Sequence, residues 1–111
     1  MASFNTKQIR DIVTSTTYDI DMDFKPDAFV CLELEENVTI DIINADGLQR
    51  LVLMLHQDSI GSRSVTFSGR FVFENGTPPT ISTTPDSLDI INFIGEDGVF
   101  YQSGSTTTNL T

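Results

Sequence analysis

The sequence predicts an all-β fold, a single-domain antiparallel β-sandwich that is jelly-roll-like and has about eight strands. Residues 18–25 alternate strictly between apolar or aromatic and charged side chains, which is the pattern of a half-buried strand. Two short apolar runs, residues 51–55 and 88–94, lie between turn signals. Because no segment sustains a helical period, we expect no long helix.

The chain has 111 residues, enough for one domain with a modest core, and no linker-like stretch divides it. We expect an N-terminal arm over residues 1–16, the sandwich over 17–102 and a flexible Ser/Thr-rich tail over 103–111. The arm lacks a strand pattern and fits either one amphipathic helical turn or an extended segment. The side chains that it could offer to a neighbouring subunit are Phe4, Ile9, Ile12 and Val13.

The first half of the sandwich reads as successive strands. Residues 29–34 and 38–43 are divided by a short polar stretch, and we interpret them as an antiparallel pair. The Asp46-Gly47 pair predicts a tight turn before a strand at 51–56. Since residues 51–55 are all apolar, this strand should be covered on both faces, although a buried helical turn would have the same pattern.

A compact polar turn follows at residues 57–64. Asp58 and Gly61 belong to the residue types that cap their own backbone or tolerate positive φ, so we predict a hairpin that leads into residues 65–67. Arg63 is close enough to reach the carboxylate of Asp58 or the loop carbonyls. We expect Gln57, Asp58, Gly61 and Arg63 to brace this turn; two solvated surface charges are the alternative.

The last third contains shorter strands. Residues 65–67 and 71–73 are aromatic or mostly β-branched and suit a sheet face. Residues 74–87, with three prolines and four threonines, predict an ordered crossing between the sheets. The Gly98 turn should join strands 88–94 and 99–102 in a final hairpin.

Composition argues against several classes of function. The formal net charge is −10 with only six Lys and Arg residues, which disfavours binding to a nucleic-acid backbone or an anionic membrane. The polar start of the chain predicts neither a secretory signal nor an anchor, and no apolar run approaches the roughly 20 residues of a membrane helix. We therefore expect neither nucleic acid nor membrane as a partner.

The sequence contains no pattern of residues that is typical of a catalytic or metal-binding site. Cys31 is the only cysteine and His56 the only histidine. We expect Cys31 to be a small buried hydrophobic residue and His56 to lie at the end of a strand. Asp19, Asp21 and Asp23 alternate like calcium ligands, but the Gly and Glu that complete such a loop are missing. The other carboxylates are scattered. We expect no enzyme, no metal site and no cofactor.

From the central turn onward, the sequence has an apolar strand, the pattern QD-x-x-GSR-[ST]-VTF, two aromatics, a Gly-Thr-Pro-Pro-Thr loop and a final Asp-Ile-Ile-x-Phe-Ile strand with Gly and Tyr after it. This succession resembles a module of bacteriophage structural proteins. It spans residues 37–102, somewhat more than half of the chain. In those proteins the module recurs in tail-fibre tips, head fibres and other virion surface components, often as trimers.

The resemblance implies a non-enzymatic structural protein at the surface of a phage virion, assembled in the host cytoplasm. Because the chain is short and has no fibre shaft, we favour a capsid decoration or cement protein on the head, which its acidic surface would suit. The alternative is a tail-fibre or head-fibre tip that binds a carbohydrate or another host-surface structure.

The expected partners are copies of the same chain and another virion protein, first of all the major capsid protein. The pattern itself predicts burial by a neighbouring copy, because a chain this small has few spare layers to cover both faces of residues 51–55 and 88–94. The number three, a homotrimer, comes only from the resemblance.

Overall fold

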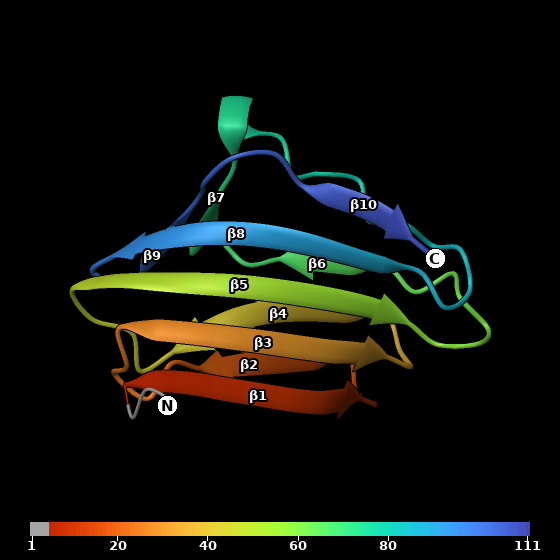
Figure 1. Cartoon of the computed structure of the whole chain (residues 1–111), viewed down its shortest axis with the longest axis horizontal. Coiled ribbons are helices and arrows are strands. Elements are labelled where there is room, and N and C mark those ends of the chain that lie inside the picture. Colours follow the sequence, from red (N-terminus) through yellow and green to blue (C-terminus); the bar gives the residue numbers. More distant parts are fainter. Residues whose placement is uncertain (1–4) are drawn as a thin grey trace.

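The computed structural model describes residues 5–111 and places them in two packed sheets (Figure 1). In the larger sheet, β1 (Thr6–Val13), β3 (Asp27–Leu34) and β5 (Leu48–Gln57) lie side by side and parallel. In the smaller sheet, β2 (Thr17–Asp21), β4 (Val38–Ile43) and β6 (Val65–Phe67) are also parallel. The predicted all-β sandwich is thereby confirmed, although its strand pairing is mixed rather than antiparallel.

The first six strands form three successive coils, because the chain crosses to the other sheet after every strand. Val13 pairs with Leu34 and Leu34 with Gln57, so that equivalent positions of successive coils stack in register. The expected antiparallel pair, residues 29–34 with 38–43, is therefore wrong, since these strands lie in different sheets. The expected hairpin across the polar turn is wrong for the same reason. Alternation defines which face of a strand is buried, but it does not define the neighbouring strand.

The C-terminal part closes the larger sheet. β8 (Leu88–Glu96) runs antiparallel to β5 and forms the predicted hairpin with β9 (Val99–Gln102). β7 (Phe71–Val72) lies parallel to β9, and a single 3-10 turn, η1 (Glu74–Gly76), follows it. Since β7 and β8 share a sheet, the crossing between the sheets occurs at residues 68–70 and not, as expected, at 74–87.

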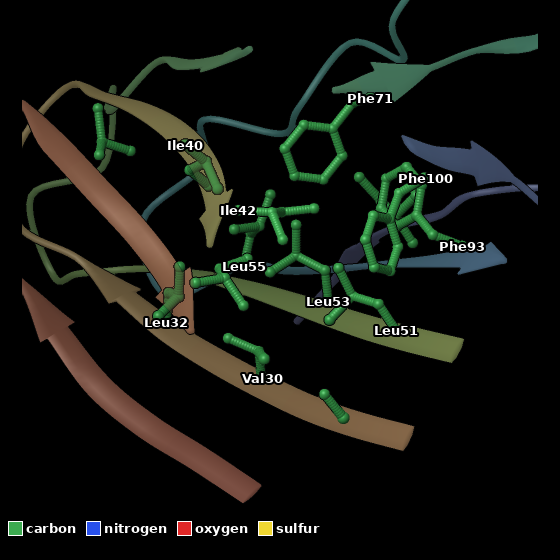
Figure 2. Close-up of a cluster of buried hydrophobic side chains, with 14 of the residues drawn as sticks. Val30, Leu32, Ile40, Ile42, Leu51, Leu53, Leu55, Phe71, Phe93 and Phe100 are labelled. Carbon is green, nitrogen blue, oxygen red and sulfur yellow. The ribbon is translucent and has the colours of Figure 1, made fainter. Parts of the chain in front are cut away.

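The core lies between the inner faces of the two sheets (Figure 2). Leu51, Leu53 and Leu55 are 0–1% exposed, whereas Val52 and Met54 point to the other face and are only partly covered. The expectation that residues 51–55 are covered on both faces is therefore not met in this chain alone. The aromatic part of the core consists of edge-to-face contacts among Phe67, Phe71, Phe73 and Phe93, in addition to buried Phe100.

Parts of the segments expected to be an arm and a tail are strands of the larger sheet. Residues 6–13 form β1, in which Val13 is buried and Ile9 packs against the core, while Ile12 is half exposed. Phe4 lies outside the described residues. In the tail, β10 (Thr107–Leu110) pairs with β8.

The strand expected at residues 18–25 ends earlier, at Asp21. Phe24 is exposed in a turn, and both Asp23 and Phe24 have positive φ. The apolar alternation continued past the end of the strand because Met22 still reaches the core. Within residues 5–111, no helix is long and apolar enough to cross a membrane.

Candidate functional site

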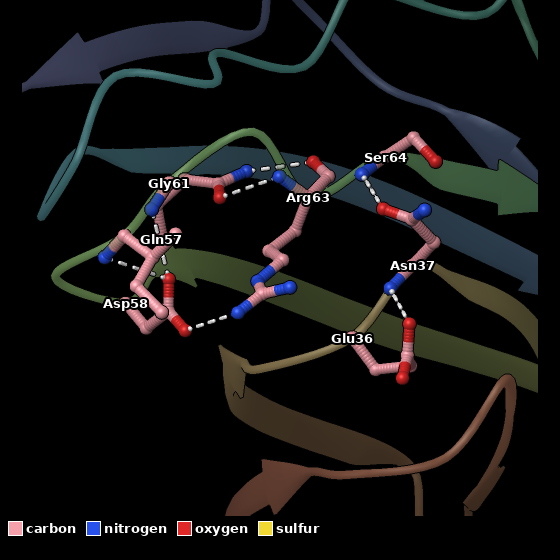
Figure 3. A network of polar contacts seen from close by, with 8 residues as sticks. Glu36, Asn37, Gln57, Asp58, Gly61, Arg63 and Ser64 are labelled. Atoms are coloured by element: carbon pink, nitrogen blue, oxygen red, sulfur yellow. Dashed lines mark hydrogen bonds and ion pairs between the residues drawn. The ribbon is translucent and has the colours of Figure 1, made fainter.

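The four residues expected to brace the central turn meet at the end of β5 (Figure 3). The side-chain oxygen of Gln57 accepts a hydrogen bond from the backbone N–H of Arg63 at 3.0 Å, and its amide nitrogen donates to the carbonyls of Arg63 and Ser82. One carboxylate oxygen of Asp58 accepts from the N–H groups of Ile60 and Gly61. We call Gln57, Asp58, Gly61 and Arg63 the polar clamp.

The second carboxylate oxygen of Asp58 forms an ion pair with the guanidinium of Arg63 at 2.9 Å. This contact, with the Gly61 N–H, holds the pKa of Asp58 below its usual 3.8. The same contact raises the pKa of Arg63, assisted by the more distant carboxylates Glu36 and Glu35. Because both oxygens of Asp58 bond to the chain itself, a ligand would have to break existing bonds to bind there. A bracing role for the polar clamp remains a prediction.

The polar clamp also holds a segment that is distant in the sequence. The N–H of Ser62 donates to the carbonyl of Thr83, and the N–H of Asp86 donates to the carbonyl of Asp58. Gly61 has φ +74°, and a Cβ there would lie 2.5 Å from the Thr83 carbonyl oxygen. The sequence pattern identified the polar clamp but not this second segment, since nothing local links the two.

A second candidate site lies beside η1. Figure 1 shows η1 at the end of the molecule opposite β1. Here a hollow of about 250 Å³ is lined by Val72, Phe73, Glu74, Tyr101 and Gln102. Tyr101 is 44% exposed, and the amide of Gln102 donates to the hydroxyl of Thr106. We call this group the η1 hollow. An exposed aromatic ring beside a carboxylate and an amide can stack on an apolar surface and hydrogen-bond hydroxyl groups.

Sequence reasoning missed the η1 hollow. Its residues come from two segments that the parallel pairing of β7 with β9 brings together, and Val72 is the register partner of Tyr101. No local pattern marks such a pairing. The only available signal was the Thr- and Pro-rich composition of residues 74–87, which indicates a surface loop.

The titratable residues that the sequence singled out are dispersed. Within the described part of the chain, no three His, Cys, Asp or Glu side chains are grouped as metal ligands. Asp21 accepts hydrogen bonds from Asn44 and from the N–H of Asp23, which lower its pKa. His56 contacts the carbonyl of Asp86 at 3.2 Å. Cys31, which we expected in the core, faces outward from β3 and is only partly buried.

Comparison with known proteins identifies the class as a structural component of phage virions. Residues 12–99 match the family described as "Putative phage tail fibre C-terminal domain". The match covers well over half of the chain, and the chain therefore belongs to this family. No curated protein and no solved structure matches the chain significantly. The tail-fibre alternative fits this finding better than capsid decoration, which nothing in the comparison supports.

Proposed function

We propose that this domain forms the distal, non-enzymatic end of a phage tail fibre and contacts the surface of the host cell. The observation that carries the proposal is the match of residues 12–99 to a tail-fibre C-terminal family. The all-β architecture is compatible with this role, because rigid sheets can hold exposed loops in fixed positions.

The two ends of the molecule differ in a way that supports an orientation on the fibre. The described chain starts at β1, and η1 projects at the opposite end (Figure 1). In this proposal the fibre attaches at the end of the molecule that carries β1. The η1 end, with exposed residues 74–78, then points away from the virion.

The η1 hollow supplies the contact chemistry in this proposal. The ring of Tyr101 would stack on the apolar face of a sugar, while Glu74 and Gln102 would hydrogen-bond its hydroxyl groups. The proposed ligand is therefore a carbohydrate of the host surface, bound without covalent chemistry.

The position on the virion is tested by labelling and counting. Gold-labelled antibodies raised against the domain should bind the ends of tail fibres in electron micrographs. Quantitative mass spectrometry should find far fewer copies of the chain than of the major capsid protein. Labelled heads with a copy number close to that of the major capsid protein would establish capsid decoration instead.

The contact with the host is tested by competition. Purified domain should slow the adsorption of phage to host cells, and Tyr101→Ser should abolish most of this inhibition. Phe24→Ser is the matched control, because Phe24 is also an exposed aromatic but lies in the turn between β2 and β3. Equal inhibition by the wild type and the Tyr101→Ser variant would exclude the η1 hollow as the contact site.

A further inference from the structure

The η1 hollow contains one formally charged side chain, and its charge is negative. Among the lining residues Val72, Phe73, Glu74, Tyr101 and Gln102, only Glu74 is charged. Glu74 is exposed, and within residues 5–111 its carboxylate has no hydrogen bond or ion pair to the rest of the chain. Both carboxylate oxygens are therefore free to accept hydrogen bonds from a ligand.

No basic side chain compensates the charge of Glu74. The lining of the η1 hollow includes none of the six Lys and Arg residues. Arg70, the nearest of them in sequence, forms an ion pair with Asp41 at 3.2 Å, and Arg63 pairs with Asp58 at 2.9 Å. A ligand that enters the hollow therefore meets a carboxylate whose charge the protein has left unpaired.

The other polar groups of the η1 hollow also favour a ligand that donates hydrogen bonds. The amide nitrogen of Gln102 already donates to the hydroxyl of Thr106 at 2.9 Å, whereas its carbonyl oxygen has no partner among the described residues. Glu74 can only accept hydrogen bonds, and a protonated amino group can only donate them. The hollow thus complements an ammonium group both in charge and in hydrogen bonding.

Tyr101 adds a second contact for a cation. Its side chain is 44% exposed, and its register partner Val72 on β7 is 39% exposed. The electron-rich face of a tyrosine ring attracts a cation that lies within about 6 Å of the ring centre. The same ring can stack on the apolar face of a sugar. A sugar that carries an ammonium group would therefore use both properties of Tyr101 and the charge of Glu74 together.

The charge of the whole molecule acts in the same direction. The formal net charge of −10 repels carbohydrates that carry carboxylate or phosphate groups, and the η1 hollow offers them no Lys or Arg side chain. A neutral sugar would be tolerated but would leave the charge of Glu74 unpaired. Among carbohydrates, a cationic one thus fits the hollow best.

We propose that the η1 hollow binds a carbohydrate with a protonated amino group, which pairs with Glu74 and lies against the ring of Tyr101. The inference rests on the proposed function, in which the same hollow contacts a carbohydrate of the host surface, and it narrows that ligand to an amino-bearing sugar. In this arrangement Glu74 binds the amino group rather than a hydroxyl, and Gln102 hydrogen-bonds a neighbouring hydroxyl.

The first test changes the ligand and not the protein. Labelled domain is bound to isolated envelopes of host cells before and after acetylation of the envelope amines, which removes their positive charge. Acetylation should weaken binding roughly 10-fold or more, because charge-assisted hydrogen bonds are lost. Amidation of the envelope carboxylates with methylamine is the control treatment and should not weaken it.

The outcomes separate this inference from the proposed function. Binding that survives acetylation, or that falls equally after both treatments, would overturn the cationic ligand and leave a carbohydrate contact standing. A domain that fails to bind untreated envelopes would contradict the proposed function itself. Protease digestion of the envelopes identifies the source of the amine: binding should persist after digestion, and its loss would assign the contact to protein lysines instead.

The second test removes the charge of Glu74. Glu74→Gln keeps the size of the side chain and should lower the affinity for untreated envelopes roughly 10-fold, without a further loss on acetylated ones. Glu35→Gln is the matched control, because it removes the same charge from an exposed residue between β3 and β4 and should bind like the wild type. Equal affinities of Glu74→Gln and the wild type, or equal losses in both variants, would overturn the pairing with Glu74.

Discussion

Gly61 combines two constraints in one residue. Its φ of +74° lies in the left-handed region that favours glycine, and the space that a Cβ would need holds the carbonyl of Thr83 and the ring of Pro85. The polar clamp therefore depends on the absence of a side chain at this position as much as on its hydrogen bonds. Only the first constraint applies to Gly47, since its φ is +61° but a Cβ there would have open space around it.

We predict that Gly61→Ala lowers the free energy of unfolding by roughly 3 kcal/mol or more, because left-handed strain and a displaced loop carbonyl add together. Gly47→Ala should cost only about 1–2 kcal/mol, the contribution of backbone strain alone. Chemical denaturation of both variants measures the difference. Equal losses would mean that the loop at Thr83 moves aside freely, which would contradict a rigid polar clamp.

At the scale of single residues, the sequence predicted only contacts between residues that are a few positions apart. Asp58 and Arg63 are five positions apart, and their residue types sufficed to predict their contact. Ser82 and Thr83 touch the same turn from more than 20 positions away, and the tertiary fold alone brings them there.

Among the elements, β1 and β10 were not predicted from the sequence, and β1 shows why. Its inward positions are Lys7, Ile9, Asp11 and Val13, so polar and apolar residues share one face. Asp11 accepts a hydrogen bond from the hydroxyl of Tyr18 at 2.9 Å, and Lys7 pairs with Asp23 at 3.7 Å. Because β1 is an edge strand, these inward-pointing charges can protect the open end of the coils against pairing with another strand. The same charged residues interrupt the alternation of polar and apolar side chains from which a strand is predicted.

The place of β1 in the domain is tested by substitution. Val13 is 1% exposed, and Val13→Ala should lower the free energy of unfolding by about 1–3 kcal/mol, since it removes buried methyl groups. Gln8→Ala, on the solvent side of the same strand, should change it by less than about 0.5 kcal/mol. Thermal denaturation compares the two variants with the wild type. If Val13→Ala left the stability unchanged, residues 6–13 would behave as a detachable arm.

At the scale of the whole molecule, the response to acid follows from its carboxylates. The pKa values of Asp21, Asp41 and Asp58 are lowered from 3.8 in the folded chain, chiefly by hydrogen bonds from Asn44, Ser68 and Arg63 respectively. The unfolded chain then binds protons more tightly than the folded one at these groups. The stability that they contribute is present above pH 3.8 and is lost as the pH falls through the lower, folded-state values.

We expect the free energy of unfolding to decline below about pH 4. Asp58→Asn should be less stable at neutral pH and should decline less steeply with acid, because it has already lost the ion pair with Arg63. Asp19→Asn makes the same change of charge on the exposed face of β2 and is the control. Denaturant unfolding curves measured from pH 7 to pH 3 give the slopes. A slope for Asp58→Asn equal to that of the wild type would exclude this carboxylate as a source of the acid sensitivity.

The sequence by itself predicted the all-β class, the faces of most strands, the β8–β9 hairpin and the contact between Asp58 and Arg63. These features depend on local alternation and on residues a few positions apart. Only the tertiary structure decided that successive strands alternate between two sheets, and that 6–13 and 107–110 are strands. The physical reason is that alternation buries the same side chains whether a strand pairs with its neighbour in sequence or with the next coil, and the choice between them depends on long-range packing of the whole core.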